Sequence, residues 1–210
     1  MKKNQKTFIS EVYDKKYYTE FCRTPDEFSK AGVLSGYHFV LDLLNPKVGE
    51  KILDIGCGTG NVIPALEKRG QVTGIDISPK VIEVAKQRGC DNCIVADIFK
   101  YSPKQKFDTI TLFGNDLGIG GTVRKTKKLL QGLKSLLKND GQILAIIRNY
   151  SHGDYKEMTL IPMWKKKVGP KFGWLIFNIN FLSVLCKEQN LNMQVISTNW
   201  KYSLVKMIKK

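Results

Sequence analysis

Three aspartates stand at nearly equal intervals along the chain, and the first opens a glycine-rich stretch. Asp54 begins "DIGCGTGN", and Asp76 and Asp97 follow in "VTGIDIS" and "VADIF". Each aspartate ends an apolar run that is typical of a buried parallel strand. Because the carboxyl ends of parallel strands meet at one sheet edge, we expect the three carboxylates to line a single crevice. The glycines of the first turn allow a ligand to approach the backbone closely.

The residue types suggest what that ligand presents. A carboxylate at Asp54 suits an amine or a sulfonium, and Asp76 can accept hydrogen bonds from two ribose hydroxyls. Asp97 can accept from the exocyclic amine of adenine, with Ile77 and Ile98 on either side of the ring. Each aspartate also has a purely structural interpretation, as the partner of a helix dipole or as the cap of a turn.

Three ligands compete for the glycine-rich turn: a nucleoside triphosphate, a dinucleotide and S-adenosylmethionine. A phosphate loop needs lysine and a hydroxyl residue after its last glycine, where this chain has Asn61 and Val62. A dinucleotide fingerprint is G-x-G-x-x-G, and here the third glycine is displaced to Gly60. The fixed charge of Asp54 would also repel a pyrophosphate. These features favour S-adenosylmethionine.

Strands and helices alternate from Lys51 to the "QILAIIRN" strand, with a turn predicted at "NDG". Ser78 followed by Pro79 predicts the start of one helix, and Thr122 predicts the cap of another. Such alternation implies right-handed crossovers and a doubly wound, mostly parallel α/β sheet. Two alternating segments at the end of the chain, "NMQVISTNW" and "YSLVKMIKK", predict an antiparallel strand pair at the sheet edge.

The regular middle is flanked by segments of different character, which predict a single domain, 1–210. Residues 1–45 are aromatic and predicted to form a helical cap, and residues 46–150 form the ligand-binding core. Residues 151–171 are irregular in pattern and are followed by the strand "FGWLIFNI". We therefore expect 151–179 to be a substrate lid or insert, and 180–210 to hold the last helix and the strand pair.

Composition sets broad limits on the class of protein. Hydrophobic residues make up 42% and charged residues 25% of the chain, which is ordinary globular usage. With neither a signal-like nor a membrane-spanning segment, a soluble cytoplasmic protein is expected. The net charge is +15, but the excess is mostly lysine spread along the chain. A solvated surface is thus favoured over a nucleic-acid face, while an anionic substrate would be attracted. Cys90 and Cys93 form a C-x-x-C without further ligands at zinc spacing, so no metal is predicted.

The segments "VGEKILDIGCGTGN", "VTGIDIS", "VADIF", "FDTITLFGNDLG" and "LLKNDGQILAI" resemble, in order, the motifs of class I S-adenosylmethionine-dependent methyltransferases. The resemblance covers about residues 45–148 and implies a Rossmann-like, seven-stranded sheet with an antiparallel last strand. It also implies which residues bind the cofactor: the aspartates and isoleucines named above, the glycines of the first turn and two residues after the fourth strand. That set is Asp54, Gly56, Gly58, Gly60, Asp76, Ile77, Asp97, Ile98, Phe113 and Gly114, to which we add Tyr17 as a residue that closes over the cofactor.

Methyl transfer from a sulfonium needs positioning of the acceptor and needs a general base only when the acceptor arrives protonated. The candidate bases are Asp116 and His152, which follow the fourth and fifth strands, and less favourably His38. Asp108, at the start of a strand in "KFDTI", is expected to face solvent.

The acceptor is left open by the sequence. The N-P-P-aromatic turn of amino-directed nucleic-acid methyltransferases is replaced by "GNDLG", and no cysteine has the context of a cytosine-directed nucleophile. These absences favour an O or N nucleophile of a small molecule. The alternatives are an RNA or protein methyltransferase that uses the basic surface, and a nicotinamide dinucleotide-binding oxidoreductase. The oligomeric state is not predicted.

Overall fold

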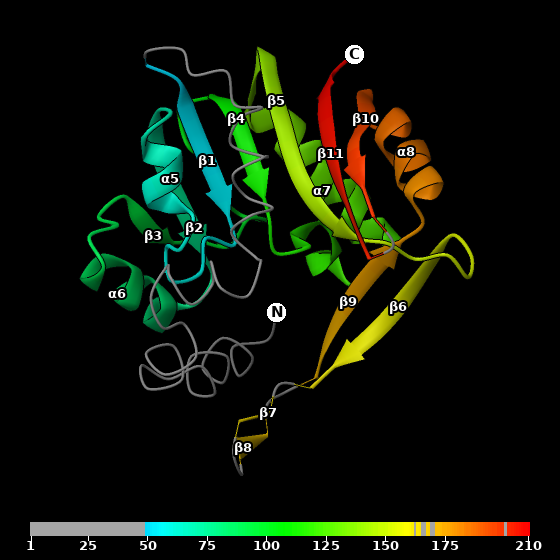
Figure 1. The fold of residues 1–210 in the computed structure, drawn as a ribbon, viewed down its shortest axis with the longest axis horizontal. Helices are drawn as coiled ribbons and strands as arrows, with labels where there is room; N and C mark the ends of the chain where they lie inside the picture. The colour runs from blue at the N-terminus through cyan, green and yellow to red at the C-terminus, as the bar shows by residue number, and fades with distance from the viewer. Residues whose placement is uncertain (1–48, 162, 165–166, 169–170, 200) are drawn as a thin grey trace.

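The computed structural model describes residues 49–161, 163–164, 167–168, 171–199 and 201–210. Its centre is a seven-stranded sheet in the order β10-β11-β5-β4-β1-β2-β3 (Figure 1). The strands are β1 (Lys51–Ile55), β2 (Gln71–Asp76), β3 (Cys93–Val95), β4 (Phe107–Leu112), β5 (Leu137–Arg148), β10 (Leu191–Thr198) and β11 (Tyr202–Lys209). The first five are parallel to one another, and β11 runs antiparallel to both β5 and β10. This confirms the predicted sheet with its antiparallel last strand.

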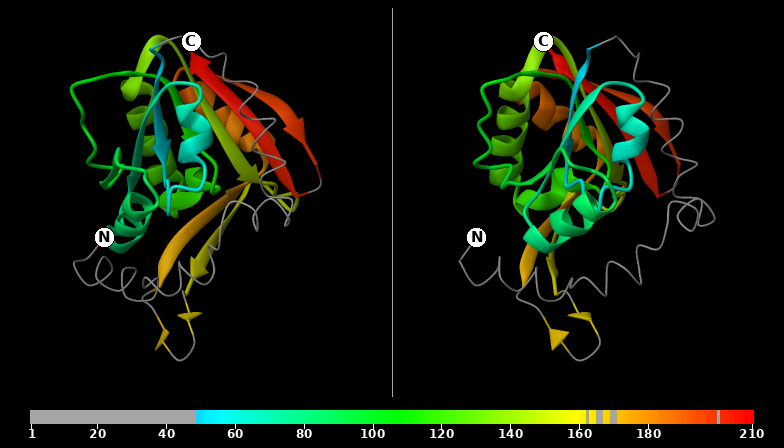
Figure 2. Two further views of the ribbon diagram at one scale, coloured as in Figure 1. Left: turned by 60° about the vertical axis from the view of Figure 1, so that its left-hand side comes forward. Right: turned by 90° about the vertical axis from the view of Figure 1, so that its left-hand side faces the viewer.

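Four described α-helices cover the two faces of the sheet: α5 (Ile63–Glu67), α6 (Pro79–Gln87), α7 (Val123–Leu136) and α8 (Ile179–Glu188). Neighbouring residues of β1 point to opposite faces, as the two-residue period of a strand requires. Leu53 packs in one apolar cluster with leucines of α7 and α8, whereas Ile52 packs in a second cluster with residues of α5 and α6. Figure 2 shows α7 and α5 on opposite sides of the sheet. The two clusters bury both faces of the central strands β1 and β4.

The two predicted helix starts differ in their hydrogen bonds. The Thr122 side chain accepts a hydrogen bond from the Lys125 backbone N–H at 3.3 Å and caps α7 as predicted. Ser78 occupies the N-cap position of α6, but its side chain makes no capping hydrogen bond and its Oγ is buried without a partner. Pro79 is the first residue of α6, which confirms the predicted helix start, and the Ser78 backbone N–H donates to Asp76.

The turn predicted at "NDG" is not a loop between helix and strand. Helix α7 ends at Leu136, and β5 begins at the next residue. The register between β4 and β5 shifts from the pair Phe107–Leu137 to the pair Thr109–Gln142. The turn-forming residues therefore form an irregularity inside β5, because the strand pairs with β4 on both sides of them.

A second difference concerns residues 151–171, which the sequence pattern leaves irregular. The structure has a strand there, β6 (Tyr155–Leu160), which pairs antiparallel with β9 (Phe172–Phe177). Short strands β7 (Met163–Trp164) and β8 (Lys167–Val168) pair beyond them. The β6 residues are mostly exposed, so the sequence lacks the apolar alternation that marks a half-buried strand. We call β6 and β9 the ribbon; Figure 1 shows it projecting beyond the carboxyl end of the parallel strands.

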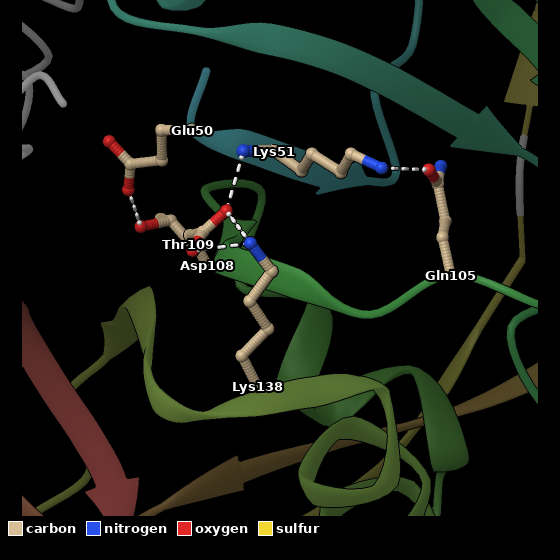
Figure 3. A network of polar contacts seen from close by, with 6 residues as sticks. All are labelled: Glu50, Lys51, Gln105, Asp108, Thr109 and Lys138. Carbon is tan, nitrogen blue, oxygen red and sulfur yellow. Dashed lines mark hydrogen bonds and ion pairs between the residues drawn. The ribbon is translucent and has the colours of Figure 1, made fainter. Parts of the chain in front are cut away.

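The opposite edge of the sheet, at the amino ends of β1 and β4, is held by a polar network (Figure 3). The Asp108 carboxylate accepts from the Lys51 backbone N–H and pairs with the Lys138 ammonium, each at 2.8 Å. The Thr109 hydroxyl donates to a Glu50 carboxylate oxygen at 2.6 Å. Partial burial raises the pKa of Asp108, but these hydrogen bonds outweigh it and hold the pKa below its usual value. Asp108 is thus a strand-entry residue, as predicted.

Within the described residues, no helix is long and apolar enough to cross a lipid bilayer.

Candidate functional site

The glycine-rich turn joins β1 to α5 and is fixed to the neighbouring strand. The backbone N–H groups of Gly56 and Cys57 both donate to the Ile75 carbonyl oxygen, at 2.9 and 3.1 Å. Gly56, Gly58 and Gly60 all have positive φ angles, of 71°, 55° and 79°. Residues that carry a side chain rarely adopt this left-handed backbone conformation, which explains why glycine occupies these alternate positions of the motif.

The three glycines face different surroundings. Among the described residues, a Cβ on Gly58 would meet only the Gly56 carbonyl oxygen, at 3.9 Å, so this part of the structure leaves the space above Gly58 open to a ligand. A Cβ on Gly60 would lie 2.5 Å from the Cys90 sulfur, so this glycine permits close packing against the loop that follows α6. The absence of a side chain therefore serves ligand approach at Gly58 and internal packing at Gly60.

The side chain of Asp116 lies against the glycine-rich turn, although the residue itself follows β4. It begins the 3-10 helix η1 (Asp116–Gly120) after β4 and is only 8% exposed. One of its carboxylate oxygens accepts from the Gly114 backbone N–H at 2.8 Å. A Cβ on Gly56 would come within 3.0 Å of the same carboxyl group. The "GNDLG" segment thus brings a carboxylate against the first glycine of the turn.

Asp76, at the end of β2, holds the same turn from the other side. One carboxylate oxygen accepts from the Gly58 backbone N–H at 3.2 Å, and the other accepts from Ser78 N–H at 2.9 Å. Burial raises the pKa of Asp76, while these backbone hydrogen bonds oppose the rise.

Asp54 is buried at the end of β1, with 4% of its surface exposed. Its carboxylate accepts a 2.6 Å hydrogen bond from the hydroxyl of Thr111, which is its register partner on β4. Burial, opposed by this hydrogen bond and assisted by Asp76, raises the pKa of Asp54 to about 7. The sequence analysis did not single out Thr111, because its proximity to Asp54 follows only from the pairing of β1 with β4.

The pKa of Asp116 is also raised to about 7, mainly by burial. The Gly114 N–H lowers it, and the charges of Asp54 and Asp76 raise it further. Three carboxyl groups from three neighbouring strand ends therefore interact electrostatically around the glycine turn. No described lysine or arginine forms an ion pair with any of them. Such a group of carboxylates is suited to a ligand that brings positive charge.

The residues predicted to surround an adenine ring lie beyond the ends of β2 and β3. Ile77 and Ile98 are half-buried, and Ile98 packs against the larger core cluster. Asp97 is half-buried, and its carboxylate accepts from the Phe99 backbone N–H at 3.1 Å. Ala96 N–H donates to the Asp76 carbonyl oxygen at 2.8 Å, which joins this segment to the end of β2. Phe113, after β4, is buried in the second core cluster.

The structure does not bring every candidate into the site. His152 is exposed in the segment between β5 and β6, where its ring lies edge-on to Tyr150 with centroids 5.9 Å apart. Tyr17 and His38 lie outside the described residues. The remaining candidates (Asp54, Gly56, Gly58, Gly60, Asp76, Ile77, Asp97, Ile98, Phe113, Gly114 and Asp116) all lie at the carboxyl ends of β1 to β4 or in the turns directly after them.

The C-x-x-C cysteines are packing residues beneath the turn. Cys57, Cys90 and Cys93 are buried free thiols. The sulfur atoms of Cys93 and Cys57 would lie 2.7 and 3.0 Å from a Cβ on Gly74. Among the residues that the structure describes, no group of three His, Cys, Asp or Glu side chains is arranged to hold a metal ion.

The ribbon contacts the segment that carries Asp116. A Cβ on Gly118 would collide with the Leu175 carbonyl oxygen and would lie 2.7 Å from the Trp174 indole nitrogen. A Cβ on Gly121 would lie 2.7 Å from the Gly173 backbone. These contacts attach β9 to η1, and the sequence analysis gave no signal for them because the partners are far apart in the chain.

The chemistry of this edge fits S-adenosylmethionine. The open space above Gly58 admits backbone contact, Asp76 and Asp97 offer acceptors for hydroxyl and amine groups, and the buried carboxyl groups suit ammonium and sulfonium charges. The fold has the Rossmann-like strand order of class I S-adenosylmethionine-dependent methyltransferases. Residues 52–141 match the family model of the methyltransferase domain, which confirms the resemblance found in the motifs.

Comparison with curated proteins gives relatives that match part of the chain. A ubiquinone biosynthesis O-methyltransferase of Haemophilus ducreyi is 26% identical over 147 residues, 64% of this chain and 61% of the relative. A malonyl-[acyl-carrier protein] O-methyltransferase of Ilyobacter polytropus is 35% identical over 99 residues, 44% of this chain and 35% of the relative. The chain thus spans less than two thirds of these relatives.

Solved structures extend the likeness over most of the fold. An S-adenosylmethionine-dependent methyltransferase of Bacteroides fragilis in complex with S-adenosyl-L-homocysteine has a TM-score of 0.70 and 25% identity, covering 80% of this chain and 76% of its own. The DhpI complex with SAH has a TM-score of 0.75 at 13% identity and covers 100% of this chain and 98% of its own. The second likeness concerns the fold alone.

Proposed function

We propose that this chain is an S-adenosylmethionine-dependent methyltransferase that transfers a methyl group to an O or N nucleophile of a small molecule by in-line displacement. The observation that carries the proposal is the glycine turn with open space at Gly58, surrounded by Asp54, Asp76 and Asp116 at three strand ends. A dinucleotide would place its pyrophosphate against these same carboxyl groups, which opposes the oxidoreductase alternative.

In this proposal the adenosine half of the cofactor lies beyond β2 and β3. Asp76 accepts hydrogen bonds from the ribose hydroxyls with lone pairs that its two backbone donors leave available. Asp97 accepts from the adenine amine, and Ile77 and Ile98 pack on the ring. The half-buried state of both isoleucines supports this role, since apolar side chains at the rim can still gain contact area.

The amino-acid half of the cofactor lies along the glycine turn, with Gly56, Gly58 and Gly60 forming its floor. The carboxylate of Asp54 attracts the ammonium group of the cofactor, and its buried position keeps this attraction from being screened by water. Phe113 and Gly114 lie beside the sulfonium. Bound S-adenosylmethionine supplies a methyl carbon that is already activated for displacement. The protein's part is then to hold the acceptor atom about 3 Å from that carbon, aligned with the breaking bond, and to exclude water.

The acceptor side is proposed to be built by residues 151–179, which include the ribbon. Its contact with η1 supports this role, because it fixes the insert next to the methyl-donor end of the site. His152 is the proposed general base for an acceptor that arrives protonated. The proposed single domain is completed by residues 1–45, with Tyr17 over the cofactor, and we propose a cytoplasmic location.

A small-molecule acceptor is supported by the names of the two relatives above, both of them O-methyltransferases. The net charge of +15 favours an anionic acceptor. The same charge keeps an RNA or protein acceptor as the alternative.

Calorimetric titration of the whole chain with S-adenosylhomocysteine and, separately, with a nicotinamide dinucleotide tests the cofactor. Binding of the first and not the second is expected, and the reverse would overturn the proposal. A metabolite extract and, separately, total RNA and total protein are then incubated with labelled methyl donor to identify the acceptor. Labelling of RNA or protein only, together with RNA retention at physiological salt, would favour the alternative.

A further inference from the structure

Asp116 follows β4, where a general base for the acceptor was expected, but its carboxyl group points back into the glycine turn. It lies against Gly56 and Gly114, which flank the proposed methionine position, and it is 8% exposed. A general base needs access to the acceptor's proton. The burial and the direction of this side chain suit a contact with the cofactor instead.

The η1 segment that carries Asp116 is held rigidly. Asn115 adopts a left-handed conformation with φ 62°, and its side-chain oxygen accepts from the Arg148 backbone N–H at 2.7 Å. On its other side, Gly118 packs against Trp174 and the Leu175 backbone of β9. These contacts preorganise the carboxyl group, which is how a protein binds a charge without reorganisation on binding.

The groups that face Asp116 define its charge state. Asp54 from β1 and Asp76 from β2 add negative charge, and the Gly114 N–H is the backbone donor from the β4 end. From β5 the contact to η1 is made by the Arg148 backbone, and the residues of β9 packed on η1 are uncharged. From α7, Lys125 packs against Gly120, at the other end of η1 from Asp116, and no ion pair joins it to Asp116 among the described residues. Asp116 therefore stands among carboxyl groups, and a positively charged ligand group would relieve the repulsion.

Resting on the proposed function, we infer that Asp116 is a cofactor-binding residue whose ionised carboxylate pairs with the positive charge at the amino-acid end of S-adenosylmethionine. Its burial raises the pKa to about 7, so part of the population is protonated near neutral pH. Binding of a cation favours the ionised form and expels that proton. Affinity for the cofactor is therefore expected to rise as the pH increases through about 7.

The test uses Asp116→Asn, which keeps an acceptor for the Gly114 N–H while removing the charge. Calorimetry measures the affinities of S-adenosylmethionine, S-adenosylhomocysteine and methylthioadenosine, which has neither an ammonium nor a sulfonium group. We expect the first two to weaken by about 10–100-fold, from the usual strength of a hydrogen bond to a charged group, and methylthioadenosine by less than about 2-fold. A larger loss for S-adenosylmethionine than for S-adenosylhomocysteine assigns the contact to the sulfonium, and equal losses assign it to the ammonium.

The matched control is Asp108→Asn, which removes the same charge at the opposite end of β4 and should leave all three affinities unchanged. Titration at pH 7 in buffers of different ionisation enthalpy should show proton release in the parent protein and less release in Asp116→Asn. Unchanged S-adenosylmethionine affinity in Asp116→Asn, or an equal loss of methylthioadenosine affinity, overturns the inference. Asp116→Ser is the second variant should the amide prevent folding. Failure of the parent protein to bind any of the three ligands would contradict the proposed function instead.

Discussion

Asp108, at the amino edge of the central sheet, has surroundings opposite to those of Asp54 and Asp116, at the carboxyl edge. At the amino edge, Asp108 receives the Lys138 ammonium and the Lys51 backbone N–H, and its pKa is lowered (Figure 3). At the carboxyl edge, Asp54 and Asp116 are buried, and the pKa of each is raised to about 7. The described partners of these two carboxyl groups are a hydroxyl and backbone N–H groups rather than ammonium groups.

This difference distinguishes a carboxylate that stabilises the fold, Asp108, from carboxyl groups that are suited to binding a ligand, Asp54 and Asp116. A carboxylate paired with lysine has already gained its counter-charge on folding. For a buried carboxyl group whose hydrogen-bond donors are neutral, ionisation costs free energy because no counter-charge is present. A cationic ligand provides that counter-charge.

The largest expected effect comes from comparing Gly60, in the glycine-rich turn, with Gly89, in the loop after α6. Gly60 and Gly89 have similar φ angles, of 79° and 84°, but a Cβ would meet Cys90 at Gly60 and no described atom within 4 Å at Gly89. Gly89→Ala should cost about 1–2 kcal/mol of folding stability from backbone strain. Gly60→Ala should cost roughly 2–4 kcal/mol, because steric overlap adds to the strain. Urea unfolding measures both, and recovery of part of the loss in Gly60→Ala with Cys90→Ala confirms the overlap. Equal losses at the two glycines would contradict it.

The next effect concerns cofactor affinity. Asp76→Ala removes the acceptor for Gly58 N–H and for the proposed ribose contacts, so it should weaken S-adenosylhomocysteine binding by about 1.5–3 kcal/mol. Isothermal titration calorimetry measures the change, with Asp108→Ala as the control from the other edge. If Asp76→Ala binds as tightly as the parent, the proposed cofactor site is misplaced.

The pH dependence of stability should have opposite signs at the two edges. The folded state holds a proton on Asp116 up to about pH 7, whereas the unfolded state releases it near 3.8. Stability therefore falls as the pH rises between those values, and Asp116→Asn should make the curve shallower by about 1–2 kcal/mol, since Asp54 shares the titration. Asp108, with a lowered pKa, contributes stability that is present above 3.8 and lost as the pH falls below it. Urea unfolding of Asp116→Asn and Asp108→Asn from pH 3 to 8 measures the two stability curves. If both variants change the curve in the same direction, the distinction between the two edges is lost.

The smallest effect is expected for the surface ion pair. Lys138→Met removes the partner of Asp108, but the lysine side chain is 45% exposed. Solvent screens such pairs, so the loss should be at most about 1 kcal/mol and should shrink in high salt. Thermal unfolding at low and high salt measures it. A loss of cofactor affinity in this variant would mean that the two edges are coupled.

Sequence patterns predicted most of the fold because its strands are buried on both faces and separated by clear turn signals. The prediction was wrong where a local signal was missing or was outweighed by tertiary contacts. The exposed β6 has no apolar alternation, and the "NDG" turn became an irregularity within β5. In the candidate site, the aspartates and glycines could be found from spacing, whereas Thr111 and Trp174 could not, since strand pairing and ribbon docking bring them there.

The sequence by itself determined the order of strands and helices, the positions of the glycines that need positive φ angles and the carboxylates at the strand ends. These features depend on periodicity and on the conformational limits of single residues. Only the tertiary structure decided the direction of the Asp116 side chain, the exposure of His152 and the attachment of the ribbon to η1. Those features depend on contacts between residues far apart in the chain, which a linear pattern does not contain.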